Sequence, residues 1–244
     1  MSSGSYYLRL ASKSGPVRLP PQEHLLQTSI PLDFRECLKA CLHGLACVCV
    51  APTVGLCRLE YFLAGGGSYR FFISFGQLYS LLPGLTGHCL RRAFYCGTLR
   101  RCSRDCKIGF GAIFSQPSAI VESHVYIGNN ALLGHVHLEQ GCLIGSRASI
   151  LSNGAAHELD DEGTWKAFDA RSVRTTRIGR NTWVGEAAVV AADVAENSMI
   201  SAGAVVSAPV PTRIMVAGNP ARFVRQLRIE PPHANGLAKN QSEL

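Results

Sequence analysis

Aliphatic residues recur about every six positions between residues 108 and 206. A spacing near six matches neither the 3.6-residue period of a helix nor the two-residue alternation of a strand. It predicts a solenoid in which each unit forms one short strand and one corner, and three units complete one coil. The aliphatic positions are Ile108, Phe114, Ile120, Ile127, Leu133, Leu138, Ile144 and Ile150 in a first series, then Ile178, Val184, Val190, Val194, Ile200 and Val206 in a second.

Two further features keep phase with this repeat. A glycine directly follows many of the aliphatic residues, as in Ile127-Gly128 and Ile144-Gly145. A small residue stands four positions after several of them, at Ala131, Ala148, Thr182, Ala188 and Ala204. Glycine tolerates the backbone geometry of a corner, and a small side chain fits the narrow interior beside it. The three features together predict a triangular parallel β-helix, with bulges at corners where the step is four, five or seven residues.

The repeat stops at Leu151 and resumes in phase at Ile178. The segment between them, 151–177, carries His157, a group of carboxylates at Glu158, Asp160, Asp161 and Glu162, and the aromatic residues Trp165 and Phe168. A segment that leaves a coil and returns in phase is an inserted loop. Loops of this length in compact domains are usually functional or disordered.

The chain before residue 108 follows other patterns. Residues 1–33 are rich in Ser, Pro and Gly and read as a loose arm, whereas 34–107 are expected to form a helical cap. Within the cap, 83–107 contains six basic side chains, with Leu90, Phe94 and Leu99 near helical spacing. Two interpretations stay open: a basic amphipathic helix on an anionic membrane surface or glycan-lipid, or a solvated basic face that packs on the next domain.

A second segment of the cap also raises the question of a membrane. Residues 41–57 contain no formal charge but include one proline and two glycines. The run is shorter than the roughly 20 apolar residues that a spanning helix needs. It therefore favours a buried segment or an in-plane contact over a true span.

Composition limits the classes of protein that this chain can be. With 47% hydrophobic and 17% charged residues over 244 positions, it is not intrinsically disordered. A net charge of +7 is compatible with nucleic acid, anionic lipid or an acidic ligand and does not choose among them. The basic segment lacks an interleaved stacking motif, so no nucleic acid partner is expected.

The ten cysteines and the N-terminal residues indicate the cellular compartment of the protein. No C-x-x-C motif occurs, which argues against a zinc ribbon or a thioredoxin motif, and no metal is expected. Small buried thiols in a reducing compartment are the simpler interpretation. Residues 1–27 lack an apolar signal segment before a cleavage site, so we expect a cytoplasmic protein.

The end of the repeat and the inserted loop resemble a known family. Residues 210–225 read VPTRIMVAGNPARFVR, the loop begins His157-Glu158-Leu159, and the chain returns as IGRNTWVG at 178–185. Over about 108–225 the sequence resembles the hexapeptide-repeat acyltransferases, which are left-handed parallel β-helices. The nearest groups are the galactoside, maltose and xenobiotic O-acetyltransferases and those that act on polysaccharide sugars. The expected fold is thus mainly β, with an N-terminal cap and a C-terminal tail at 226–244.

The resemblance implies a chemical role for His157. An acceptor hydroxyl has a pKa far above neutrality and needs a base as it attacks a thioester, and imidazole titrates in the useful range. Direct transfer in a ternary complex is expected, since no G-x-S-x-G elbow argues for an acyl-enzyme. Glu158, Asp160, Asp161 or a backbone carbonyl remain alternatives for orienting the base.

The resemblance also implies an acetyl-CoA site, in the groove between neighbouring subunits of a homotrimer. The positions that match are Trp183 and Gly185 in the return motif, Ala202 and Ser207 along the pantetheine groove, and Arg222 and Arg225 at the nucleotide phosphates. A guanidinium fork suits a phosphate oxyanion.

Two positions depart from the family pattern. Glu186 stands where relatives often have serine and Ala208 where they often have lysine. Both changes remove favourable contacts with an anionic donor, unless Arg213 compensates.

The acceptor is expected to be a hydroxyl on a sugar or a surface-polysaccharide intermediate. His135 and His137 are either acceptor or metal contacts or exposed polar positions on a coil face. Because a β-helix does not determine function, a non-catalytic scaffold or membrane-docking subunit remains an alternative. A zinc carbonic anhydrase of this fold is a weaker one, since no H-x-x-x-x-H pair occurs.

Overall fold

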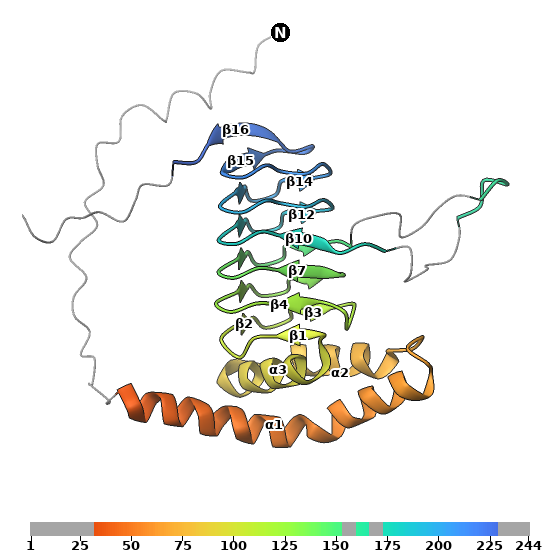
Figure 1. The fold of residues 1–244 in the computed structure, drawn as a ribbon, viewed down its shortest axis with the longest axis vertical. Coiled ribbons are helices and arrows are strands. Elements are labelled where there is room, and N and C mark those ends of the chain that lie inside the picture. Colours follow the sequence, from red (N-terminus) through yellow and green to blue (C-terminus); the bar gives the residue numbers. More distant parts are fainter. Residues whose placement is uncertain (1–31, 153–159, 166–172, 229–244) are drawn as a thin grey trace, which may run out of the picture. The chain divides into compact units, whose positions relative to one another are not determined.

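The computed structural model describes residues 32–152, 160–165 and 173–228, with the backbone alone for 32–36, 38 and 39. From Ala40 onward the chain forms one compact unit. Three helices come first and a stack of short strands comes after them (Figure 1).

The helices are α1 (Leu32–Leu63), α2 (Arg70–Ser80) and α3 (Gly84–Thr98). The turn after α1 contains Gly65 and Gly66, which both have positive φ values that glycine adopts without strain. Helices α2 and α3 pack against each other and against the first strands of the stack. Phe72, Tyr79, Phe94 and Tyr95 form the aromatic centre of that contact.

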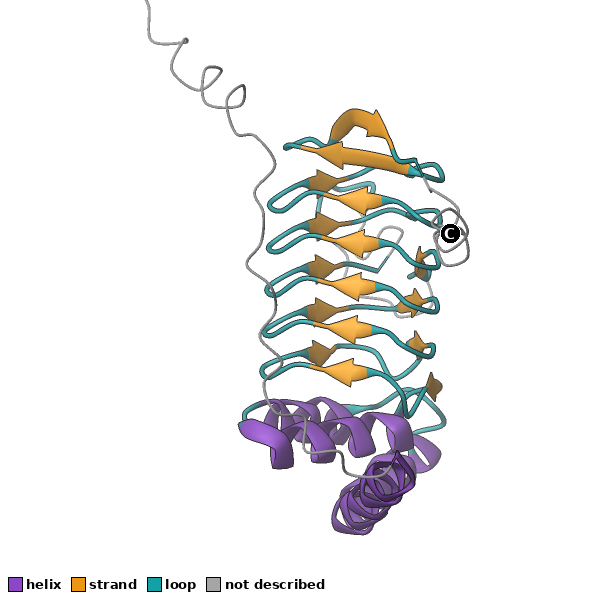
Figure 2. Cartoon of the chain, turned by 90° about the vertical axis from the view of Figure 1, so that its left-hand side faces the viewer, coloured by secondary structure: helices purple, strands orange, loops and turns teal. Residues whose placement is uncertain are grey.

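The strands form three parallel sheets, here called A, B and C, which are the faces of a triangular prism (Figure 2). Sheet A contains β1 (Arg101–Cys102), β4 (Ile120–Val121), β7 (Val136–Leu138) and β10 (Thr176–Ile178). Sheet B contains β2 (Lys107–Ile108), β5 (Tyr126–Ile127), β8 (Leu143–Ile144), β11 (Trp183–Val184), β13 (Met199–Ile200), β15 (Ile214–Ala217) and β16 (Arg222–Gln226). Sheet C contains β3 (Ile113–Phe114), β6 (Leu132–Leu133), β9 (Ser149–Ile150), β12 (Val189–Val190) and β14 (Val205–Val206).

Successive coils run through sheets A, B and C in turn, so the corners are A–B, B–C and C–A. Every strand pair is parallel except β15 with β16, which closes the stack. The fold is a left-handed parallel β-helix of about five turns. The six-residue repeat predicted the triangular parallel β-helix, and the family resemblance implied its left hand.

The interior follows the predicted repeat closely. Thirteen of the fourteen aliphatic positions are buried, and so are all five small residues four positions later. The exception is β4, where Val121 is buried and Ile120 is half-buried on the outside. The seven-residue step therefore falls before β4, at the corner that contains Pro117, and not after it as the sequence suggested.

The corner glycines are required by the close stacking of coils. A Cβ on Gly185 would lie 2.4 Å from the backbone nitrogen of Ala202 in the next coil, and one on Gly145 would lie 2.6 Å from that of Glu186. Real Cβ atoms do not approach backbone atoms so closely, so these positions admit only glycine without a shift of the coil. The structure thus gives Gly185 a packing role.

Helix α3 is buried rather than exposed along its apolar side. Phe94 and Tyr95 have no exposed surface, and the Arg91 side chain is only 2% exposed. Arg91 donates hydrogen bonds to the carbonyl oxygens of Tyr79 (3.0 Å), Leu82 (2.9 Å) and Ile108 (3.2 Å). Of the two interpretations of 83–107, the structure supports a segment packed on the next domain.

Arg91 joins the end of α2 to the first coil, so its loss is expected to destabilise the fold. Arg91→Met removes these bonds and a longer one to the carbonyl oxygen of Ser80 (3.4 Å), so the carbonyl oxygens lose a charged donor. We expect the free energy of unfolding to fall by about 2–4 kcal/mol in denaturant titrations. Arg101→Met, at an exposed position, should change it by no more than about 0.5 kcal/mol. Equal effects of the two changes would contradict this role.

Candidate functional site

The inserted loop leaves and re-enters the stack at the C–A corner. It starts after β9 and ends at β10, and both of its ends are bonded to one residue of the coil below. The backbone nitrogen of His135 donates to Ser152 Oγ at 2.8 Å, and Thr176 N donates to His135 O at 2.9 Å. The His135 Nε2 atom also lies 3.1 Å from Thr175 Oγ1. His135 therefore holds the two ends of the insertion together.

His135 is uncharged near neutral pH. Its partial burial, reinforced by the positive charge of Arg100, lowers the pKa of the imidazole below its usual 6.5. A neutral imidazole can accept a hydrogen bond on one nitrogen and donate from the other. The side chain is thus able to bond a hydroxyl group, as it already does with Thr175.

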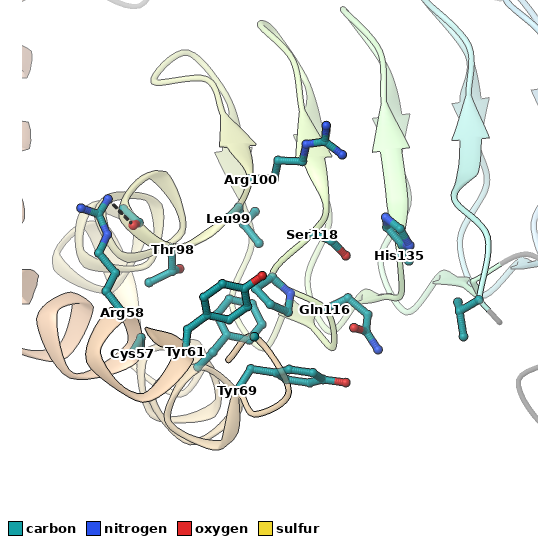
Figure 3. A pocket seen from close by; sticks show the side chains of 15 residues that line it. Cys57, Arg58, Tyr61, Tyr69, Thr98, Leu99, Arg100, Gln116, Ser118 and His135 are labelled. Atoms are coloured by element: carbon teal, nitrogen blue, oxygen red, sulfur yellow. Dashed lines mark hydrogen bonds between the residues drawn. The ribbon is translucent and has the colours of Figure 1, made fainter. Parts of the chain in front are cut away.

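A cavity of about 680 Å³ lies next to this corner (Figure 3). Tyr61 and Tyr69 line it from the helical side. The coil side contributes Arg100, Gln116, Ser118 and His135, and the end of the insertion contributes Val173. Aromatic faces with a few convergent polar groups are typical of small-molecule sites. The size suits a ligand such as a sugar.

His137 has a different environment from His135. Its Nε2 atom lies 2.9 Å from Glu122 Oε1 on the outer face of sheet A. That contact, with a backbone bond from Gln140, lowers the pKa of the Glu122 carboxyl. His137 is therefore a paired polar position on a coil face, whereas His135 lines a cavity. Among the described residues, no group of three His, Cys, Asp or Glu side chains is placed to hold a metal.

The residues predicted for the donor site lie in three places. Trp183 is on the outer face of sheet B, 49% exposed, in an apolar column formed by Tyr126, Leu143, Trp183, Met199 and Met215. Ala202 is exposed at the B–C corner, directly above Gly185 and close to Glu186. Ser207 is exposed at the C–A corner, as is Ala208.

The basic candidates lie at the closing end of the stack. Arg222 and Arg225 are exposed on β16, where Arg225 pairs with Met215 and Arg222 with Ala217 of β15. Arg213 is exposed at the A–B corner, with a left-handed backbone. The structure thus brings Trp183 and the two arginines onto sheet B, with Ala202 at its edge, and places Ser207 one sheet away.

His157 and Glu158 lie outside the described residues. Of the candidate orienting groups, Asp160 and Asp161 are described, and Asp161 is exposed. The Asp160 Oδ1 atom accepts hydrogen bonds from the backbone nitrogens of Glu162 (3.1 Å) and Thr164 (2.7 Å). Asp160 therefore holds a turn within the insertion.

Sequence comparisons decide which proteins this chain resembles. It is 31% identical over 116 residues to a Saccharomyces cerevisiae protein whose assignment as an acetyltransferase is itself provisional. It is 29% identical over 87 residues to the galactoside O-acetyltransferase of Escherichia coli. The chain is thus similar in sequence to acetyltransferases. The predicted resemblance is confirmed.

The relation to these acetyltransferases is partial. The first match covers 43% of this chain and 57% of the yeast protein, and the second covers 35% and 40%. The chain thus spans about half the length of the curated relatives it matches. A galactoside acetyltransferase solved with coenzyme A has a TM-score of 0.49 at 16% identity, over 64% of this chain and 81% of that one. No family model matches the sequence.

Sequence reasoning missed the residues on the helical side of the cavity. Tyr61 and Tyr69 belong to no motif and come from either side of the glycine turn. Only the packing of α1 on α2 and α3, and of α2 and α3 on the first coil, brings them opposite His135. The one available signal for His135 was the coil repeat, which places it about one coil before the start of the insertion.

The lowered pKa of His135 predicts a dependence of stability on pH. The unfolded chain binds protons more readily than the folded one, so stability is complete above about pH 6.5 and is lost as pH falls below it. We expect the free energy of unfolding to drop between about pH 7.5 and pH 5.5, and His135→Gln to reduce that drop. His124→Asn, at an exposed corner, is the control. If the free energy of unfolding of His135→Gln depended on pH as that of the wild type does, the lowered pKa of His135 would be refuted.

Proposed function

We propose that the protein is a CoA-dependent O-acetyltransferase that moves an acetyl group from acetyl-CoA to a hydroxyl of a sugar or surface-polysaccharide intermediate. The observation that carries the proposal is the insertion at the C–A corner. It bears His157 and lies within a β-helix whose sequence is related to acetyltransferases. A cavity suited to a sugar lies beside the point where the insertion returns.

His157 is proposed as the general base of a direct transfer. It takes the proton from the acceptor hydroxyl while the oxygen attacks the thioester carbonyl. The carbon–sulfur bond breaks, an ester forms, and the proton passes to the leaving CoA thiolate. Backbone N–H groups near the corner would stabilise the oxyanion that develops.

The donor is proposed to lie along sheet B and its B–C edge. Trp183 supplies an exposed aromatic face for the pantetheine arm, and Ala202 is exposed on the same edge. Arg222 and Arg225 supply positive charge for the phosphates. The apolar column around Trp183 is available for a neighbouring subunit, which supports a homotrimer with the donor in its groove. We place this assembly in the cytoplasm.

The acceptor is proposed to occupy the cavity at the C–A corner. Tyr61 and Tyr69 offer aromatic faces to the apolar side of a sugar ring. Gln116, Ser118 and His135 offer groups that donate or accept hydrogen bonds with its hydroxyls. Val173 belongs to the same lining, so a ligand here would touch the returning end of the insertion.

The base is tested by His157→Ala. The variant should fold like the wild type and bind acetyl-CoA. Its kcat/KM for acetyl transfer should fall by about 10²- to 10⁴-fold, the usual contribution of a general base. Transfer from labelled acetyl-CoA to a panel of sugars, measured beside a thermal melt, gives both readouts. Turnover near that of the wild type would remove His157 from the mechanism.

The acceptor cavity is tested by filling it. Ser118→Phe places a ring in the cavity and should lower kcat/KM for the acceptor by about tenfold or more, with acetyl-CoA affinity unchanged. Ser123→Phe makes the same change at the A–B corner, outside the cavity, and should leave both quantities unchanged. Equal acceptor kinetics in the two variants would place the acceptor elsewhere.

A further inference from the structure

The outward side of helix α1 is apolar from Ala40 to Leu63. Leu45, Val48, Leu56, Leu59, Phe62 and Leu63 are between 43% and 80% exposed, and this set is here called the outer face. No charged residue occurs between Ala40 and Cys57. Among the described helices, Ala40–Leu63 alone is long and apolar enough to cross a membrane, with a mean hydropathy of 1.8 and 17% of its window buried.

The opposite side of α1 is attached to the protein. Ala46, Val50 and Cys57 are buried, at helical spacing. Thr53 Oγ1 lies 3.0 Å from the hydroxyl of Tyr79, and Gly97, in α3, is in close contact with Val54. An isolated apolar helix is typically buried or spans a membrane. Among the described residues, one side of α1 is covered by the protein and the other side is exposed.

The two charges of Ala40–Leu63 are both directed to the protein. Arg58 donates to the carbonyl oxygen of Gly97 at 3.0 Å. Glu60 accepts hydrogen bonds from Ser68 Oγ (2.6 Å) and from the backbone nitrogens of Arg70 (2.9 Å) and Phe71 (2.8 Å). These contacts hold the second half of α1 beside α2 and α3. A helix held in this way cannot cross a bilayer without breaking them.

Positive charge is concentrated in the part of the chain that contains α1 and the elements packed on it. Residues 40–107 contain eight Lys and Arg side chains against two Asp and Glu, which gives +6 of the chain's formal +7. Arg91 is buried, but Arg58, Arg70, Arg100, Arg101, Arg104 and Lys107 are exposed. Anionic lipid attracts such basic residues over a Debye length, whereas apolar side chains enter the boundary between headgroups and acyl chains.

We propose that the outer face of α1 lies in the plane of an anionic lipid bilayer, at the level of the headgroups. An interfacial helix usually carries its own polar face. In this protein, the side of α1 opposite the outer face packs on the rest of the protein. The rest of the protein therefore takes the place of a polar helix face and remains in water. The contact therefore uses α1 and not the buried apolar side of α3. The binding itself does not require acetyl transfer, whereas its consequence for acceptor access rests on the proposed function.

The cavity gives this contact a consequence for substrate access. Tyr61 lines the cavity and lies directly before Phe62 and Leu63 of the outer face. Phe62 and Leu63 are 80% and 73% exposed, so the outer face reaches the helical side of the cavity. A hydroxyl carried by a membrane-anchored acceptor would thus be presented beside Tyr61 and Tyr69.

The test is flotation of the purified full-length chain with vesicles of phosphatidylcholine, alone or with phosphatidylglycerol. We expect binding to the anionic vesicles that weakens with salt, and little binding to neutral ones. Val48→Gln/Phe62→Gln removes two highly exposed apolar side chains without changing charge. It should lower vesicle affinity by about tenfold or more.

A matched control keeps the outcome specific. Leu132→Gln/Leu151→Gln makes the same kind of change at Leu132 of the coil stack and at Leu151, the first residue of the insertion. Both are exposed, and the variant should bind like the wild type. Absence of vesicle binding by the wild type, or equal binding by both double variants, would overturn the proposal. Retention on membranes after an alkaline carbonate wash would also overturn it, since α1 would then span. A larger oligomer that only Val48→Gln/Phe62→Gln dissociates would assign the face to a second copy.

Discussion

Parallel backbone pairing between successive coils is the constraint on which the rest of this structure depends. Strands pair at a spacing near 4.8 Å, so each coil must repeat the backbone path of the one below it. Corner glycines such as Gly145 and Gly185 exist because the next backbone occupies the place of a Cβ. An added segment can therefore leave the stack only at a corner, and 151–175 does so between sheets C and A.

The pairing constraint also explains why the candidate site lies where it does. The insertion needs an anchor on a neighbouring coil, and His135 provides it through its backbone and its imidazole. The first coil needs a cover at its open end, which α2 and α3 supply through Arg91. The cavity forms where this cover and that corner meet. The contacts that cover the open end of the first coil therefore also form part of the proposed acceptor site.

The coil stack could be predicted from sequence because its determinants are local and repeated. Each buried aliphatic residue, corner glycine and small residue indicates the same coil geometry. An error in one unit, such as the choice of Ile120 in place of Val121 as the buried residue, therefore does not change the predicted fold. The cap could not be predicted in this way. The periodicity of 83–107 revealed a helix but not that its apolar side is buried, because that depends on α2 and the first coil. The distinction between His135 and His137 depends on Glu122 and Thr175, which are distant in sequence.

The most direct test of the acetyltransferase account is calorimetry of acetyl-CoA with the purified wild type beside Arg222→Ala. The account predicts micromolar binding that weakens in the variant, because a guanidinium at the donor phosphates would be lost. It further predicts that the protein binds acetyl-CoA although Glu186 and Ala208 differ from the residues expected at these positions. No detectable binding to the wild type would contradict it and favour a different acyl donor or a non-catalytic scaffold.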